Sequence, residues 1–139
     1  MILRDPEYAD YKWITECYED WPMGNEGPVT DQKAVDWLRR WLVRGDIKCR
    51  VLQDAEPLGL ITYTRDLFTC VVKNIVVRPK YRGHGASTKM IRFLRDELVA
   101  DGVVVAEFDT LPGIIRNQLG TRYQDLGGGR GRLVWDMEL

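Results

Sequence analysis

Histidine and cysteine are scarce in this chain of 139 residues, and their scarcity excludes several kinds of protein. There is one histidine, His84, and the three cysteines (Cys17, Cys49 and Cys70) include no close pair. We expect reduced thiols in a cytoplasmic protein, because an odd number of widely spaced cysteines does not build a disulfide framework. We also expect no metal cofactor, since a structural zinc site takes about four such ligands.

Long hydrophobic runs and an excess of one charge are missing too. No apolar stretch approaches the roughly 18 residues that a membrane-spanning helix needs. Residues 1–10 carry acids where a signal peptide carries positive charge. The formal net charge is −1, with 45% hydrophobic and 29% charged residues. We therefore expect a globular protein with neither a membrane nor a nucleic-acid partner.

Charge is nevertheless distributed unevenly along the chain. Residues 1–36 contain nine acidic and three basic residues, a net −6, which leaves +5 for the remainder. This asymmetry fits two ligands of opposite charge. It fits a solvated acidic helix face equally well, and both interpretations stay open.

Hydrophobic periodicity predicts an alternation of strands and helices. The expected strands are 1–4, 47–53, 58–65, 68–77, 103–109 and 133–139. The expected helices are 6–21, with Asp5 as N-cap and Pro6 at its first position, and 31–45, 88–99 and 112–126. The order β-α-α-β-β-β-α-β-α-β, with a turn over 127–132, predicts one α/β domain over 1–139. A mixed central sheet is flanked by helices, and 68–109 forms a right-handed parallel crossover.

A basic, glycine-rich turn joins the strand 68–77 to the helix 88–99. Gly83 and Gly85 allow positive φ and close approach to a ligand, and Arg82 offers donors suited to phosphate oxygens. Ser87 or Thr88 could cap the helix or donate to a phosphate, and a helix N-terminus attracts anions. We expect a pyrophosphate here; the alternative is a plain turn. The pattern is neither a dinucleotide fingerprint nor a Walker loop.

The stretch NIVVRPKYRGHGASTKMIRFL resembles motif A of the GNAT superfamily, the acetyl-CoA-dependent N-acetyltransferases. Ile75, Val77, Pro79, Arg82 and Gly85 match its pattern, and Ser87 stands where the family has glycine or alanine. Further on, YQDLG (123–127) resembles the Tyr-x-x-x-Gly of motif B. The order of strands and helices also looks like this fold over nearly the full chain.

The resemblance implies an enzyme that moves an acetyl group from acetyl-CoA to a primary amine by direct transfer in a ternary complex. It implies that backbone N–H groups of Arg82 to Ser87 hold the pyrophosphate of coenzyme A. The strands 68–77 and 103–109 would splay apart to admit the pantetheine arm, and the Ile75 N–H would polarise the thioester carbonyl. The expected cofactor-binding residues are Ile75, Val77, Arg82, Gly83, His84, Gly85, Ala86, Ser87 and Thr88. His84 lies inside the turn, which favours a phosphate-side or solvent-facing residue over a general base.

Catalytic groups are less clearly marked. By resemblance Tyr123 would protonate the departing thiolate; the alternative is a buried tyrosine closing the last helix. Some family members place a glutamate four residues before the Ile75 position, where this chain has Val71. Glu107 and Asp109 on the neighbouring strand are the nearest substitutes, acting through a water, with Asp66 more remote. An ordinary surface role for Glu107 and Asp109 is the alternative.

In this family the first two helices and their loop form much of the acceptor side. They contain four of the five tryptophans, and of these Trp37 and Trp41 are expected in the core. The expected substrate-binding residues are Glu19, Asp20, Glu26 and Asn117, the first three for an ammonium group. The acceptor is a small molecule or a protein lysine or N-terminus, and a homodimer is an option. Two rival functions stay open: a GNAT-like domain with reduced or lost catalysis that binds proteins or is structural, and a nucleotide-binding regulatory domain.

Overall fold

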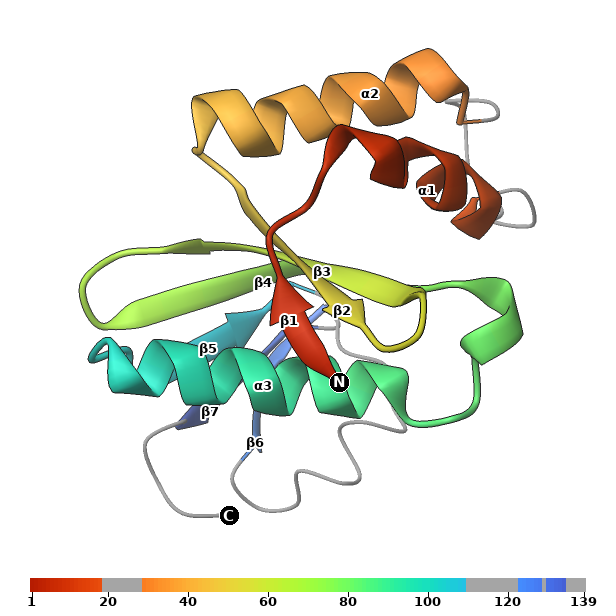
Figure 1. Cartoon of the computed structure of the whole chain (residues 1–139). Helices are drawn as coiled ribbons and strands as arrows, with labels where there is room; N and C mark the ends of the chain where they lie inside the picture. The colour runs from red at the N-terminus through yellow and green to blue at the C-terminus, as the bar shows by residue number, and fades with distance from the viewer. Residues whose placement is uncertain (19–28, 110–122, 129, 135–139) are drawn as a thin grey trace.

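The computed structural model describes residues 1–18, 29–109, 123–128 and 130–134. Within these ranges seven strands form one sheet in the order β1-β2-β3-β4-β5-β7-β6 (Figure 1). The strands are β1 (Ile2–Arg4), β2 (Lys48–Gln53), β3 (Pro57–Arg65), β4 (Thr69–Val77), β5 (Val105–Phe108), β6 (Tyr123–Gly127) and β7 (Arg130–Val134). The helices are the 3-10 turn η1 (Tyr8–Asp10), α1 (Tyr11–Cys17), α2 (Asp31–Arg39), the π-helical turn η2 (Arg40–Arg44), the 3-10 turn η3 (Pro79–Tyr81) and α3 (Ala86–Ala100).

The pairing of β4 with β5 is parallel, as predicted, and the other pairings are antiparallel. β5 pairs only with Thr69–Val72 of the longer strand β4. The rest of β4, Lys73–Val77, continues past the end of β5. Asn74–Val77 stay paired with β3 on the other side, with a bulge at Lys73, and no other described strand pairs with this segment. We call this segment the open β4 edge.

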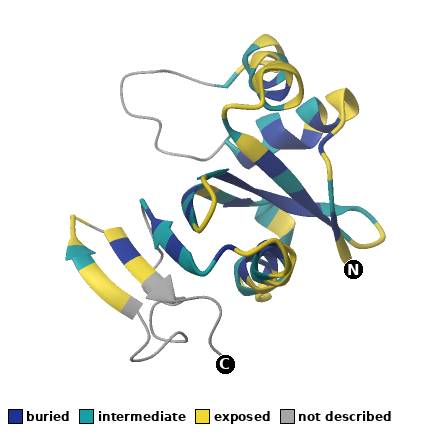
Figure 2. Ribbon diagram, turned by 90° about the vertical axis from the view of Figure 1, so that its left-hand side faces the viewer, coloured by how far each residue is buried: buried dark blue, intermediate teal, exposed yellow. Residues whose placement is uncertain are grey.

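Helices cover both faces of the sheet. Figure 1 shows α1 and α2 on one face and α3 on the other, and Figure 2 shows buried residues along the central strands between them. Alternate residues of a strand face opposite sides, so Ile61 and Val72 pack toward α3 while Leu60 and Val76 pack toward α1 and α2. The apolar stripe predicted for α3 is buried as expected: Met90, Ile91, Leu94 and Leu98.

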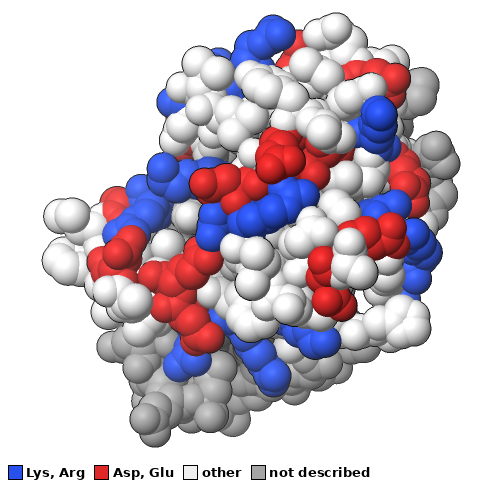
Figure 3. Space-filling view, viewed as in Figure 1, with Lys and Arg blue, Asp and Glu red and all other residues white. Residues whose placement is uncertain are grey.

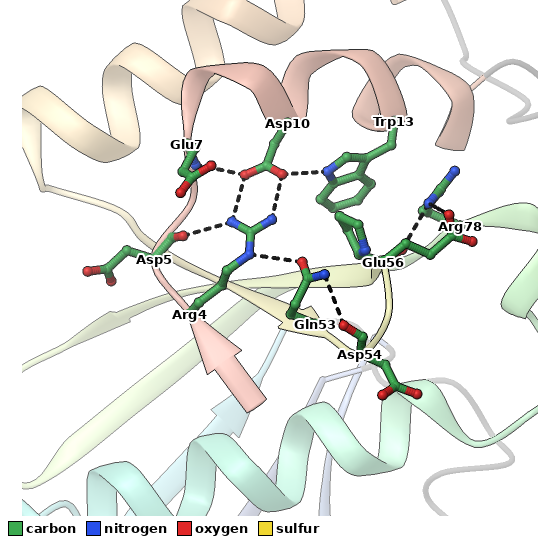
Figure 4. Close-up of polar contacts among 10 residues, drawn as sticks. Arg4, Asp5, Glu7, Asp10, Trp13, Gln53, Asp54, Glu56 and Arg78 are labelled. Carbon is green, nitrogen blue, oxygen red and sulfur yellow. Dashed lines mark hydrogen bonds and ion pairs between the residues drawn. The ribbon is translucent and has the colours of Figure 1, made fainter. Parts of the chain in front are cut away.

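The first helix begins later than predicted, because Asp10 turns inward instead of extending a surface helix. Its carboxylate is 4% exposed and accepts hydrogen bonds from both Nη atoms of Arg4, at 3.0 and 2.8 Å (Figure 4). The Trp13 indole N–H and the Glu7 backbone N–H also donate to it, each at 2.7 Å. This network fixes a 3-10 turn over Tyr8–Asp10, and α1 starts at Tyr11. Asp5 is therefore no N-cap.

Burial and hydrogen bonding act in opposite directions on the pKa of Asp10. Burial alone would raise the pKa, but the hydrogen bonds from Arg4, Trp13 and the Glu7 N–H outweigh it and hold the pKa below its usual value. Arg4 also donates from Nε to Gln53 on β2, at 3.0 Å. The network therefore joins β1, β2 and α1.

The second helix agrees with the prediction and has an additional feature at its end. Thr30 caps α2 by accepting from the Lys33 N–H. The helix then widens into the π-helical turn η2, in which the Gly45 N–H donates to the Arg40 carbonyl at 3.2 Å. Gly45 ends it in the left-handed conformation, with φ 68°, as its position predicted.

The C-terminal prediction is partly wrong. Of the helix expected over 112–126, residues 112–122 lie outside the described residues, but Tyr123–Gly127 form strand β6. The last described strand is Arg130–Val134, so it starts before 133, and 135–139 lie outside the described residues. Gly127 and Gly128 have φ of 86° and 63°, and the turn of the β6–β7 hairpin lies within the predicted range 127–132 but is shorter.

The three cysteines are buried and free, which agrees with the expectation of reduced thiols. In the ranges that the structure describes, no helix has both the length and the apolar character to cross a membrane.

Candidate active site

The glycine loop, Arg82–Gly85, lies between η3 and the first turn of α3. Gly83 and Gly85 have φ of 81° and 80°, as predicted. A Cβ added to either would meet no atom within 4 Å, so both glycines face open space. Gly85 itself occupies the N-cap position, and a glycine has no side chain that could cap the helix. Ser87 and Thr88 lie inside the helix, so neither is the N-cap, and their donation to a phosphate stays a prediction.

The first turn of α3 leaves peptide N–H groups outside the helical hydrogen-bond ladder. The first helical bond runs from the Lys89 N–H to the Gly85 carbonyl, at 3.1 Å. The N–H groups of Ala86 and Ser87 precede it and have no acceptor within the helix. Together with the helix dipole, they make this helix end suited to an anion. His84 is exposed within the loop.

Arg82 is used differently from the prediction. Its Nε donates to the Val77 carbonyl at 3.1 Å and its Nη2 to the Cys17 carbonyl at 3.0 Å. Its backbone N–H donates to Pro79 at 3.3 Å. The guanidinium thus ties the glycine loop to β4 and to the last residue of α1. The loop amides that remain for an anion are those after Arg82.

The open β4 edge presents backbone groups away from β3. Gly59 lies opposite Val77 in the register, and the Arg78 N–H donates to the next residue of β3, Leu58, at 2.9 Å. Hydrogen-bonded and non-hydrogen-bonded positions alternate along an antiparallel pair. Ile75 and Val77 therefore direct their N–H and C=O groups away from β3, on the side that β5 has already left. This is the geometry that a bound extended chain requires.

A cavity of about 360 Å³ lies on the α1 and α2 face of the sheet and reaches Ile75. Three aromatic side chains line it: Tyr18, Trp37 and Trp41. The prediction that Trp37 and Trp41 are core residues is only partly right. Both pack against the buried cluster of this face, yet both are half-buried and line the cavity.

Two tyrosines differ in their relation to this cavity. Burial raises the pKa of Tyr18 to about 12, so its hydroxyl is protonated at neutral pH. Tyr123 lies in the cross-strand row of Leu133, Ala106 and Cys70. Tyr123 is therefore three strands away from Ile75 across the sheet and five residues away along the strand direction. At ordinary sheet spacings these offsets are roughly 15 Å and 16 Å. The register thus places the backbone of Tyr123 away from that of Ile75, and its role as proton donor stays a prediction.

Glu107 lies directly beside Val71 in the β4–β5 register. Glu107 is therefore the neighbour, on the next strand, of the position at which the resemblance would place a glutamate. Val71 pairs with Thr64, which shares its face of β3 with the cavity residue Thr62. The carboxylate is 21% exposed and accepts from Arg132 Nη2 at 2.8 Å. Glu107 is thus held by an ion pair on the cavity face of the sheet.

The two other carboxylates have different partners. Asp109 follows β5 and pairs with Lys73 Nζ at 3.0 Å, at the start of the open β4 edge. Asp66 accepts from the backbone N–H groups of Thr69 and Phe68, at 2.9 and 3.0 Å, and these bonds lower its pKa. It shapes the β3–β4 turn, at the end of β4 away from Ile75, so we no longer consider it as a base.

The charge asymmetry of the sequence is partly used inside the protein. Asp5 pairs with Arg50 at 2.6 Å, and Glu16 pairs with Arg78 at 3.1 Å. Each pair joins the acidic first quarter to the basic remainder. Figure 3 shows acidic and basic side chains interleaved across the face that it displays. These two acids thus form ion pairs between elements of the fold.

A family model described as the acetyltransferase (GNAT) family matches residues 10–112. The chain belongs to the GNAT family of acetyltransferases. It is thus an acyltransferase, and the family that motif A indicated is confirmed. No curated protein sequence matches it.

Solved structures of N-acetyltransferases share the fold of this GNAT acetyltransferase. The PaiA N-acetyltransferase of Thermoplasma acidophilum, crystallised with coenzyme A, has a TM-score of 0.71 at 12% identity, over 95% of this chain and 97% of its own. A spermidine N-acetyltransferase variant from Vibrio cholerae has a TM-score of 0.73 at 14% identity, over 97% of this chain and 95% of its own. An aminoglycoside 6'-N-acetyltransferase complexed with coenzyme A has a TM-score of 0.70 at 11% identity, over 100% of this chain and 99% of its own. These likenesses confirm the mixed α/β fold.

The expected substrate-binding residues Glu19, Asp20, Glu26 and Asn117 lie outside the described residues. Among the described ones, no group of three or more histidine, cysteine, aspartate or glutamate side chains is placed to hold a metal ion. Sequence reasoning missed the polar cavity residues Arg40, Thr62 and Asn74. Only Asn74 carried a signal, as a polar side chain next to the apolar run Ile75–Val77 of its strand.

Proposed function

We propose that this GNAT acetyltransferase moves an acetyl group from acetyl-CoA to a primary amine, by direct transfer while both are bound. One observation carries the proposal. The outward peptide groups of Ile75 and Val77 lie between an open glycine loop and a cavity that reaches the same strand. A donor bound along this edge would meet an acceptor that enters from the cavity.

The described residues suit coenzyme A, although the Val77 carbonyl also accepts a hydrogen bond from Arg82 Nε. The amides from Gly83 to Ser87 and the dipole of α3 would hold its pyrophosphate, because both glycines are open and the N-cap is itself a glycine. Ile75 and Val77 would pair with the pantetheine arm as an added strand does. Acetyl-CoA supplies an acetyl group activated as a thioester. We assign the Ile75 N–H to the developing charge on the acetyl oxygen.

We assign the general base to Glu107, with Asp109 as second candidate. Glu107 lies beside Val71 on the cavity face, and a bridging water would extend its reach to an amine. Asp109 lies past the end of β5 and is held by Lys73. For the proton returned to the leaving thiolate, Tyr18 is the protonated hydroxyl that lines the cavity.

Calorimetry with acetyl-CoA tests the proposal, together with an assay of thiol release in the presence of primary amines. We expect micromolar binding that Gly85→Glu abolishes, because the substitution puts a side chain and a negative charge at a left-handed position beside the bound pyrophosphate. Gly102→Glu is the matched control. Gly102 also has positive φ, 91°, and open surroundings, but lies past the other end of α3.

Normal binding by the Gly102 variant and none by the Gly85 variant supports the enzyme. Absence of acetyl-CoA binding by the unmodified protein contradicts it and favours a protein-binding or structural role. Tighter binding of ATP than of coenzyme A would favour a nucleotide-binding regulatory domain.

A further inference from the structure

The cavity beside Ile75 has a predominantly aromatic and aliphatic wall. The rings of Tyr18 and Trp37 meet edge to face, with centroids 5.3 Å apart and an interplanar angle of 64°. Trp41 adds a third ring from η2, and Leu60 and Val76 form a buried floor. Such a wall gains most from an apolar, planar ligand, because ring faces and edges pack closely against one another.

The polar groups on the sheet side of the cavity are few. Asn74 donates from Nδ2 to Thr62 Oγ1, at 3.3 Å. This orientation leaves the side-chain carbonyl oxygen of Asn74 as an acceptor next to Ile75. One acceptor beside the strand that would carry the acetyl group suits one amine nitrogen.

The charge of the cavity wall is positive in the part that the structure describes. The described lining includes no carboxylate, and its single ionised side chain is Arg40, which donates from Nη2 to Asp46 at 3.0 Å. The described part of this wall would offer a ligand with several ammonium groups no carboxylate to pair with them. It would also place them near a cation, and both effects disfavour binding.

We infer that the acceptor is a small monoamine with a flat, apolar body, such as an arylalkylamine, rather than a polyamine or an aminoglycoside. The inference rests on the proposed N-acetyltransferase function and specifies its substrate class. The volume of about 360 Å³ is at the lower end of the range for small-molecule sites. It accommodates a ring and a short chain. Arg40, Trp37 and Trp41 then determine specificity.

Direct binding tests this inference independently of turnover. Phenethylamine and spermidine are titrated into the protein saturated with coenzyme A, and calorimetry measures both dissociation constants. We expect phenethylamine to bind about tenfold more tightly, or better, which is the factor expected from burying a phenyl ring. Equal or tighter binding of spermidine overturns the inference.

Two variants and one control locate the effect in the cavity. Trp41→Leu should weaken phenethylamine about tenfold and spermidine much less. Arg40→Gln should strengthen spermidine by several fold and leave phenethylamine nearly unchanged. Leu42→Ala removes an exposed neighbour on η2 that does not line the cavity, and it should change neither ligand.

Arg40 is about half exposed, with 45% of its side chain accessible, so we expect the fold to tolerate its replacement. Arg40→Gln therefore tests the inference even if Trp41→Leu destabilises the fold. Equal effects of Arg40→Gln on the two amines overturn the assignment of specificity. The titration of coenzyme A that precedes each experiment reports separately on the proposed function. Failure of that step is therefore distinguishable from failure of the amine preference.

Discussion

Arg82 donates a hydrogen bond to the carbonyl of Cys17, 3.0 Å away, although 65 residues separate the two in the chain. The same guanidinium donates to Val77 on β4. Cys17 is the last residue of α1, and a basic side chain at a helix C-terminus is favoured by the exposed carbonyls. The loop proposed to hold the cofactor is thereby connected to the helix that precedes Tyr18, a residue of the proposed acceptor cavity.

Replacing Arg82 should affect the acceptor more than the cofactor. In Arg82→Lys the charge remains but the two-pronged contact is lost. We expect the KM for an amine acceptor to rise about tenfold, the factor for one lost hydrogen bond to a charged group. The acetyl-CoA dissociation constant should change by less than about threefold, because the loop amides stay in place. Steady-state kinetics and calorimetry measure the two quantities.

The control for this prediction is Arg92→Lys, on an exposed residue of α3, which should change neither quantity. If Arg82→Lys weakens acetyl-CoA binding strongly and leaves the amine KM unaltered, the side chain serves the cofactor alone and the connection to α1 has no functional role.

Exchange of Glu107 for glutamine tests the assignment of the base. Glutamine keeps the size and one acceptor oxygen but cannot take up a proton. We expect kcat to fall by a factor on the order of 100 to 10,000, the contribution typical of general base catalysis. Asp109→Asn should lower kcat by less than about threefold. The reverse order of the two effects would transfer the role to Asp109.

Substitution by phenylalanine distinguishes the roles of Tyr18 and Tyr123 in the same way. Tyr18→Phe removes a hydroxyl from the cavity wall, whereas Tyr123→Phe alters a residue on a strand three positions across the sheet from β4. If Tyr18 is the proton donor, its variant should lose a factor of about 100 in kcat and the Tyr123 variant little. A large loss for Tyr123→Phe alone would restore the role that the resemblance implied.

The parts of the fold that were predictable from sequence depend on local interactions. The stripe on α3, the left-handed glycines and the Gly45 stop each follow from residues within one or two turns. By contrast, Tyr123–Gly127 form a strand because they pair with β7. Their own composition gave a weak helical signal, and tertiary pairing overrides such signals.

The site shows the same division. The glycine loop was identified from one short stretch of sequence. The cavity was not, because its wall combines α1, α2, η2, β3 and β4, and only packing brings these elements together. The position of Glu107 beside Val71 depends on the strand register, which periodicity does not specify. The turn of Asp10 toward Arg4 and Trp13 likewise needed the folded contacts.

Asp10 should make the stability depend on pH in the acidic range. Its pKa is lower in the folded protein than in the unfolded chain, so its stabilising contribution is complete above the unfolded pKa of about 4. The contribution is lost as the pH falls through the folded pKa. At neutral pH, Asp10→Asn should cost about 3 kcal/mol, because it leaves Arg4 without its buried partner. Urea unfolding at a series of pH values measures this.

The control is Asp5→Asn. The Asp5 side chain is 85% exposed in its pair with Arg50, and its loss should cost less than about 1 kcal/mol. The difference between the unmodified protein and Asp10→Asn should shrink as the pH is lowered below about 4. A difference that stays constant would show that Asp10 does not titrate with folding.

Hydrogen exchange at single backbone amides tests the central claim most directly, because the proposed cofactor contacts are main-chain groups that side-chain substitutions leave in place. On addition of coenzyme A, the amides of Ile75 and of Gly83 to Ser87 should exchange more slowly, while that of Gln124 on β6 should not change. Unaltered exchange at these loop and strand amides, with coenzyme A at saturating concentration, would contradict the proposed binding of the cofactor.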